Sequence, residues 1–128
     1  MAEHQSERPV LTPGPDHPIT IEPNPARVLV TVAGRTVADT REALTLREAS
    51  YPPVQYVPLQ DVDTSLLIAT DHETYCPYKG DASYYTIEGA GEAGVNAVWE
   101  YRDPRPAVEP IRGHVAFYAD RTQISEEA

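Results

Sequence analysis

The chain has 128 residues, of which 41% are hydrophobic, and this length suits one domain built around a single core. Twenty acidic residues against ten basic ones give a net charge of −10, which repels the phosphates of nucleic acids and of anionic membranes. A single cysteine excludes an internal disulfide and a zinc site on paired cysteines, and no apolar run reaches the roughly 18 residues that span a membrane.

The first residues are polar and acidic, with no apolar run behind them. We therefore expect a cytoplasmic protein that has neither a nucleic acid nor a membrane as its partner and that uses no metal or other cofactor. We expect it to act as a monomer or a homodimer.

Composition along the chain predicts one β domain between two tails. Residues 1–16 carry several prolines among polar residues and are expected to form a flexible tail. Residues 17–124 form the domain, and residues 125–128 are expected to be a second flexible tail. The first strand is predicted at residues 19–22, in an edge position because prolines follow it.

A β-hairpin is predicted where residues 27–33 and 36–39 alternate in polarity on either side of a turn at Gly34. The next strand, at residues 43–48, points its two leucines to one side. Glu48 ends that strand on the face of the leucines. It is either a solvated strand end or a charged group aimed into a cleft.

Three prolines keep residues 51–58 extended, because proline removes backbone donors and restricts the residue before it. Asp61 or Asp63 is then placed to cap a short helical turn that runs through Leu66. A strand is expected directly after this turn, at residues 67–70.

Alternating polarity in the second half of the chain predicts further strands at residues 82–87, 95–101 and 115–119. A glycine-rich loop is expected at residues 88–94. Seven to nine short strands and one or two helical turns predict an all-β fold of antiparallel sheets, either a sandwich or a partly open barrel. The strand at 95–101 is expected to place four side chains on one face: Val95, Ala97, Trp99 and Tyr101.

The turn at residues 75–80 holds the only cysteine and the only lysine of the chain, Cys76 and Lys79. An ammonium three positions from a thiol would favour the thiolate and make Cys76 a nucleophile, and His72 would offer a base. In the alternative interpretation, Cys76 packs as a small hydrophobic residue in a structural turn and Lys79 pairs with an acid. His72 would then lie in a solvated turn between two acidic residues.

Asp61 and Asp63 have the spacing of carboxylates that hold divalent metals in nucleotidyl transfer. Such enzymes also need a Gly-Ser turn that cradles phosphates, and this chain has no Gly-Ser dipeptide. Helix capping is therefore the favoured role of both aspartates. His4, His17 and His114 lack the spacing of a ligand set and are interpreted as surface or hydrogen-bonded structural residues.

Aromatic side chains concentrate in the strands that flank the turn at residues 75–80. Most should belong to the core, but tyrosine and tryptophan carry a polar tip that needs a partner. Close to Glu48 and Lys79, such side chains would line a pocket. The residues concerned are Tyr84, Tyr85, Trp99, Tyr101, Phe117 and Tyr118.

Five sequence blocks follow one another in the order Glu48, then residues 53–58, 76–85, 96–101 and 113–118. The third begins Cys-Pro-Tyr-Lys-Gly and the fourth ends Trp-Glu-Tyr. Together these blocks resemble the family catalogued as domain of unknown function 427, over almost the whole predicted β domain.

The resemblance implies a β-tent-like arrangement of two antiparallel sheets that meet at an angle, similar to Rab-binding exchange chaperones and glutathione-dependent formaldehyde-activating-like proteins. Those proteins often carry zinc on paired cysteines, and because Cys76 is alone, zinc is not carried over. The family is sometimes labelled nucleotidyltransferase, a label that the missing Gly-Ser turn leaves without physical support here.

We therefore predict a domain that binds a small polar or anionic ligand in a cleft between the sheets, either as a binding protein or as an enzyme. Glu48 would serve as acid, base or ion partner, Lys79 would hold an anion, and Cys76 is the third catalytic candidate. The alternatives are a chaperone-like protein-interaction module and nucleotidyl transfer on Asp61 and Asp63. The residues predicted to bind the ligand are Glu48, Tyr56, Cys76, Lys79, Tyr85 and Trp99.

Overall fold

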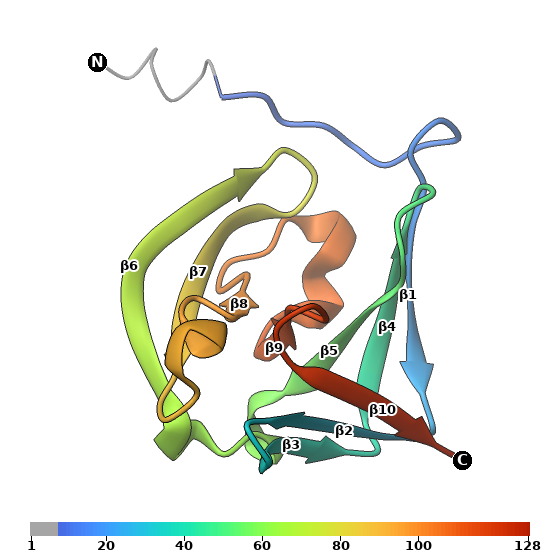
Figure 1. Cartoon of the computed structure of the whole chain (residues 1–128). Coiled ribbons are helices and arrows are strands. Elements are labelled where there is room, and N and C mark those ends of the chain that lie inside the picture. Colours follow the sequence, from blue (N-terminus) through green and yellow to red (C-terminus); the bar gives the residue numbers. More distant parts are fainter. Residues whose placement is uncertain (1–7) are drawn as a thin grey trace.

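The computed structural model describes residues 8–128, which form two antiparallel sheets (Figure 1). The larger sheet has seven strands in the order β1-β4-β5-β9-β8-β7-β6, and the smaller has three in the order β10-β2-β3. The predicted all-β fold of two antiparallel sheets is confirmed. The strands are β1 Ile19–Asn24, β2 Arg27–Val32, β3 Arg35–Thr40, β4 Ala43–Glu48, β5 Val54–Pro58, β6 Leu67–Cys76, β7 Gly80–Ile87, β8 Val98–Glu100, β9 His114–Phe117 and β10 Gln123–Glu127.

The larger sheet curves, so that β6 and β7 lie on one side of the molecule in Figure 1 and β1 and β4 on the other. The smaller sheet crosses below. Its hairpin, β2 and β3, turns at Ala33 and Gly34, whose φ angles of 52° and 75° are the left-handed values that a two-residue hairpin turn requires. A backbone bond from Asp63 N to Val37 O, 2.8 Å long, ties this hairpin to the segment after β5.

Short 3-10 turns connect the strands. The predicted cap is present at η2, where the Asp63 carboxylate accepts a hydrogen bond from the backbone N–H of Ser65. The turns are η1 Leu59–Asp61, η2 Thr64–Leu66, η3 Gly91–Gly94 and η4 Pro106–Ile111. In the described part of the chain, no helix is long and apolar enough to cross a membrane.

Two strands differ most from their predicted bounds. β6 continues to Cys76 instead of ending at residue 70, and a register shift against β7 hides its alternation. β8 begins only at Val98, because η3 and a left-handed Asn96 (φ 51°) interrupt the predicted strand. Val95 is consequently 47% exposed and does not share a buried face with Ala97.

The predicted flexible tails need correction where the structure describes them. Residues 1–7 of the first tail lie outside the described residues, but Leu11 N donates to Pro77 O over 3.1 Å and the Tyr75 hydroxyl donates to Pro9 O over 2.6 Å. At the other end, residues 125–127 belong to β10, which pairs with β2. Both segments are held by tertiary contacts that local composition does not reveal.

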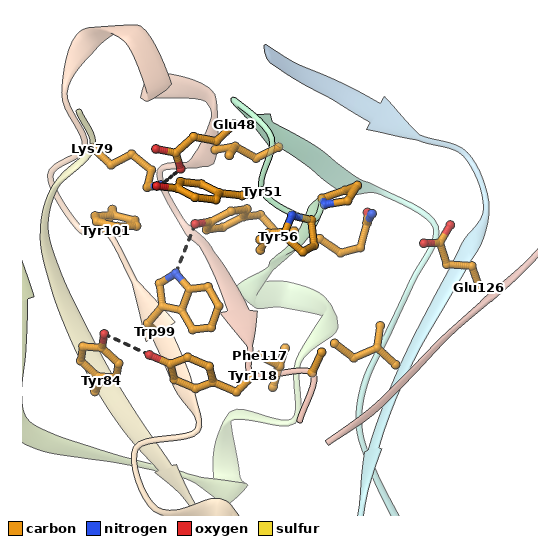
Figure 2. A pocket seen from close by; sticks show the side chains of 17 residues that line it. Glu48, Tyr51, Tyr56, Lys79, Tyr84, Trp99, Tyr101, Phe117, Tyr118 and Glu126 are labelled. Carbon is orange, nitrogen blue, oxygen red and sulfur yellow. Dashed lines mark hydrogen bonds and ion pairs between the residues drawn. The ribbon is translucent and has the colours of Figure 1, made fainter. Parts of the chain in front are cut away.

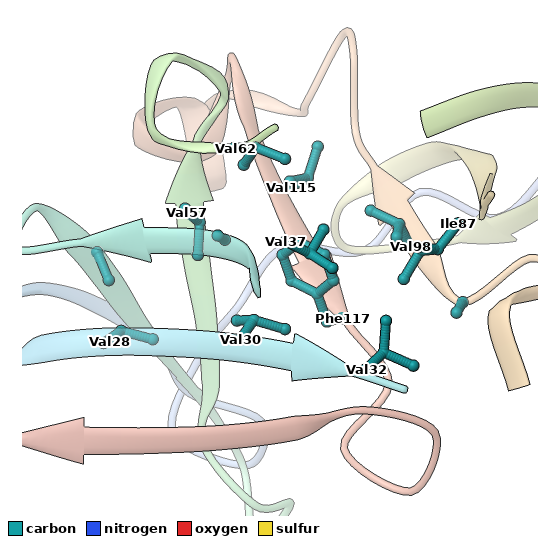
Figure 3. Packing of buried hydrophobic residues seen from close by; sticks show 13 residues of the cluster. Val28, Val30, Val32, Val37, Val57, Val62, Ile87, Val98, Val115 and Phe117 are labelled. Atoms are coloured by element: carbon teal, nitrogen blue, oxygen red, sulfur yellow. The ribbon is translucent and has the colours of Figure 1, made fainter. Parts of the chain in front are cut away.

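The first core cluster joins the two sheets. Figure 3 shows valines of β2 and β3 packed against side chains from β5, β8 and β9 of the larger sheet. Val28, Val57 and Val115 are completely buried within it. A second cluster surrounds Tyr56 and Leu46 and continues the apolar surface toward the concave side of the larger sheet. The core thus fixes the angle at which the sheets meet.

Removing residues 123–128 should lower the free energy of unfolding by about 2 kcal/mol or more, because Ile124 of β10 packs against the first core cluster. Urea denaturation measures the change. Removal of Ala128 alone, which lies beyond β10, is the control and should have little effect. Equal stability of the longer deletion and the full chain would mean that β10 is not part of the folded domain.

Candidate functional site

A cavity of about 620 Å³ lies on the concave side of the larger sheet, and β10 of the smaller sheet borders it. Seven of its seventeen lining residues are aromatic, and two carboxylates and one ammonium lie among them (Figure 2). The lining residues are Leu46, Glu48, Tyr51, Pro52, Pro53, Val54, Gln55, Tyr56, Lys79, Tyr84, Trp99, Tyr101, Phe117, Tyr118, Ala119, Ile124 and Glu126.

Glu48 and Lys79 form a buried ion pair at one end of this cavity, and each is only 9% exposed. The ammonium Nζ of Lys79 donates to Oε1 of Glu48. The second carboxylate oxygen, Oε2, lies 2.7 Å from Nε2 of His17. Of the two alternatives left open for Glu48, the structure therefore shows the charged group at the cavity, and not the solvated strand end.

The pKa of Glu48 is set by two opposing effects. Burial raises it, but hydrogen bonds and charge interactions with Lys79 and His17 outweigh burial and hold the pKa below its usual value. The carboxylate is therefore ionised at neutral pH and remains the acceptor of both bonds.

The turn between β6 and β7 carries Lys79 to this position. Its backbone N–H bonds to Cys76 O over 3.2 Å, and its carbonyl accepts from Arg105 N over 3.0 Å. Gly80 follows with a φ of 111°, a value that side chains disfavour, and a Cβ there would lie 3.4 Å from Asp103 O. The Cys-Pro-Tyr-Lys-Gly block therefore forms a turn that points the side chain of Lys79 into the cavity.

The sequence does not place His17 beside Glu48, and it does not place Tyr51 or Glu126 at the cavity. The His17 ring stacks on Tyr78 with centroids 4.0 Å apart and planes 3° apart, and Tyr51 meets it edge-on at 6.2 Å. Ile19 pairs with Glu48 across β1 and β4, so His17 lies just beyond the end of that ladder. Only the register of two strands reveals this proximity, and no motif in the chain signals it.

Tyrosine hydroxyls and one indole N–H supply the uncharged polar groups of the cavity (Figure 2). Trp99 Nε1 donates to the Tyr56 hydroxyl over 3.2 Å, and Tyr56 is only 1% exposed. The Tyr84 hydroxyl contacts those of Thr74 at 2.9 Å and Tyr118 at 3.4 Å. These groups cross-link the aromatic walls.

Burial affects three of the cavity tyrosines. It raises the pKa of Tyr56 and Tyr101 well above the usual value, and it raises that of Tyr118 to about 12. The Tyr56 oxygen accepts from Trp99, and no acceptor for its own proton is found among residues 8–128. A ligand in the cavity would find a hydrogen-bond donor there.

Four of the six residues predicted to bind a ligand line the cavity, namely Glu48, Tyr56, Lys79 and Trp99. The other two do not. Cys76 is half-buried and packs against the second core cluster, which is the structural alternative considered for it. Tyr85 donates its hydroxyl to Glu100 over 2.6 Å, away from the lining.

The remaining candidates lie apart from the cavity. Asp61 accepts a 2.7 Å hydrogen bond from Thr40, and Asp63 caps η2. His72 lies in β6, not in a turn, and its ring meets that of Tyr84 at 4.5 Å. Across residues 8–128, no three His, Cys, Asp or Glu side chains gather as a metal ion would require, so the residues present do not fit the divalent metal of nucleotidyl transfer.

A family model matches most of the chain. The family model NTP_transf_9, described as a domain of unknown function (DUF427), matches residues 20–128. No curated protein matches the chain.

Replacing Glu48 by Gln should lower the free energy of unfolding by about 3 kcal/mol at pH 7, because Lys79 would stay buried without a counter-charge. Urea denaturation measures this loss. Glu22→Gln, on the exposed side of neighbouring β1, is the matched control and should change little. Similar values for both variants would show that the ion pair contributes nothing.

The stability difference between the wild type and Glu48→Gln should shrink as the pH falls. Glu48 has a lowered pKa in the folded state, so its contribution is present above the unfolded value of about 4.3 and is lost as the pH drops through the folded value. Denaturation curves at several pH values below 5 measure this trend. A difference that grows toward low pH would contradict the assignment.

Proposed function

Since the chain belongs to the family described as domain of unknown function DUF427, we propose its function from the cavity: the domain binds a small polar molecule there. One observation carries the proposal. The Tyr56 hydroxyl is deeply buried at the cavity wall, and its proton has no acceptor among the described residues. A buried hydroxyl whose proton has no acceptor favours the binding of a ligand that carries a hydrogen-bond acceptor.

The size and the walls of the cavity support a ligand of small-molecule dimensions. A volume of about 620 Å³ falls within the range of roughly 300 to 1,000 Å³ that is common for such sites. Trp99 and Tyr118 present adjoining rings, with centroids 4.6 Å apart, on which a flat or ring-shaped group can pack. Only a few polar groups lie among these walls, and such groups usually determine which ligand a pocket selects.

The charges of the lining favour an uncharged polar ligand over an anion. Lys79 was predicted to hold an anion, but Glu48 already neutralises its ammonium. Glu126 adds a second carboxylate to the lining. An anionic ligand would have to displace a buried ion pair inside an acidic protein, which costs several kcal/mol.

The two alternative functions have less support. A protein-interaction module would need a broad apolar surface, whereas the large exposed apolar side chains are dispersed along the chain: Ile68 lies in β6, and Tyr51 and Val95 lie in two different loops. Nucleotidyl transfer would need Asp61 and Asp63 free for metal, whereas Asp61 accepts a hydrogen bond from Thr40 of β3 and Asp63 caps η2.

Binding can be measured on the indole N–H resonance of Trp99, because the chain contains one tryptophan. A panel of neutral fragments with hydroxyl and carbonyl groups should include members that shift this resonance in a saturable way. Tyr56→Phe should weaken their binding about fivefold, the worth of one hydrogen bond.

Tyr85→Phe removes a hydroxyl outside the cavity and is the control that should leave the affinity unchanged. If no fragment perturbs the indole resonance, or if Tyr56→Phe binds as tightly as the wild type, the proposal is wrong.

A further inference from the structure

We propose that Lys79 is a reactive amine that condenses with the aldehyde or ketone group of a small molecule in the cavity and forms an imine. The cavity would then be a covalent site for carbonyl compounds. This inference rests on the proposed function, since the carbonyl compound must first enter the cavity.

Lys79 lies where a nucleophile could reach a bound ligand. It lines the cavity at the end of a shaped turn, and its Nζ lies 5.9 Å from the centroid of the Tyr101 ring. It is also the only lysine of a chain whose other basic side chains are arginines. Arginine would form the same ion pair, but only lysine can release a proton and attack a carbonyl carbon.

The pairing of Lys79 provides a path for its proton. Nζ donates to Oε1 of Glu48, and Oε2 of the same carboxylate lies 2.7 Å from Nε2 of His17. The His17 side chain is 23% exposed and so reaches solvent. The carboxylate that accepts the hydrogen bond from Nζ is the base nearest to the amine, and the imidazole beside it is partly open to solvent.

The reaction balances with the groups present. The neutral amine attacks the carbonyl carbon, a C–N bond forms, and the carbonyl electrons move to oxygen, which takes a proton from a tyrosine such as Tyr56. The nitrogen then loses its extra proton to Glu48. The hydroxyl of this carbinolamine takes that proton from Glu48 and leaves as water, and the nitrogen lone pair closes the C=N bond. The iminium nitrogen then gives its remaining proton to the deprotonated tyrosine. One water is released, and no oxidant or reductant takes part.

The walls of the cavity would preserve the product. Tyr56, Tyr84, Trp99 and Tyr101 are buried or half-buried and surround the reactive end with aromatic surface. Limited access of water slows the hydrolysis that reverses imine formation. The unused proton of Tyr56 is available to the carbonyl oxygen at the start of the reaction.

Reductive trapping tests the proposal on the full chain. The protein is incubated with benzaldehyde at neutral pH, reduced with cyanoborohydride and analysed by peptide mass spectrometry. Because Lys79 is the only lysine, the α-amine of the chain is the sole competing primary amine and serves as an internal standard. An α-amine is ordinarily the more reactive of the two, since its pKa is near 8 in model peptides.

We expect Lys79 to carry the benzyl group and to react about tenfold faster than the α-amine. Tyr56→Phe should slow the labelling of Lys79 about fivefold or more, because the carbonyl oxygen loses its proton donor, while leaving labelling of the α-amine unchanged. Lys79→Arg should confine the label to the α-amine. Circular dichroism checks that each variant is folded. The ratio of the labelling rates of Lys79 and the α-amine in the wild type tests the proposal without any variant.

Two outcomes would overturn the proposal, and they differ from failure of the proposed function. Labelling of Lys79 no faster than the α-amine, while benzaldehyde shifts the Trp99 indole resonance, would refute the imine and leave ligand binding in place. Slow labelling together with an unshifted indole resonance across the fragment panel would refute both.

Discussion

The buried carboxylate of Glu48 joins three distant parts of the chain. It ends β4, it accepts the ammonium of Lys79 from the β6–β7 turn, and it contacts His17 from the segment before β1. Because each partner comes from a different segment, this one group links the turn and the N-terminal segment at the cavity, beside the bond of Leu11 to Pro77 and the stacking of His17 on Tyr78. A buried charge is tolerated only when it is paired and hydrogen-bonded, which explains the dense contacts around it.

The rest of the site follows from the curvature of the larger sheet. The first core cluster holds the smaller sheet against the strands β5, β8 and β9, which leaves the concave side between β4 and β7 open to aromatic side chains. Those side chains are fixed by bonds among their own polar tips, such as Trp99 to Tyr56. The aromatic walls of the cavity are therefore held by hydrogen bonds within the protein.

Much of the fold can be predicted from the sequence, because alternation in β2 and β4, the glycine turn and the Asp63 cap are local signals. The site is predicted less completely. Tyr84 lines the cavity while its neighbour Tyr85 bonds to Glu100, since successive strand residues point to opposite faces and sequence alone does not say which face is concave. His17 meets Glu48 only through the register of β1 and β4, which is a long-range property.

A double-mutant cycle on Glu48 and Lys79 tests most directly whether this pair organises the site. Free energies of unfolding are measured by urea denaturation for the wild type, Glu48→Gln, Lys79→Met and the double variant. The structure predicts a coupling energy of about 2 kcal/mol, because each single change leaves the other group buried without its partner. A coupling energy near zero would mean that the two groups do not meet in the folded protein, and it would contradict the account.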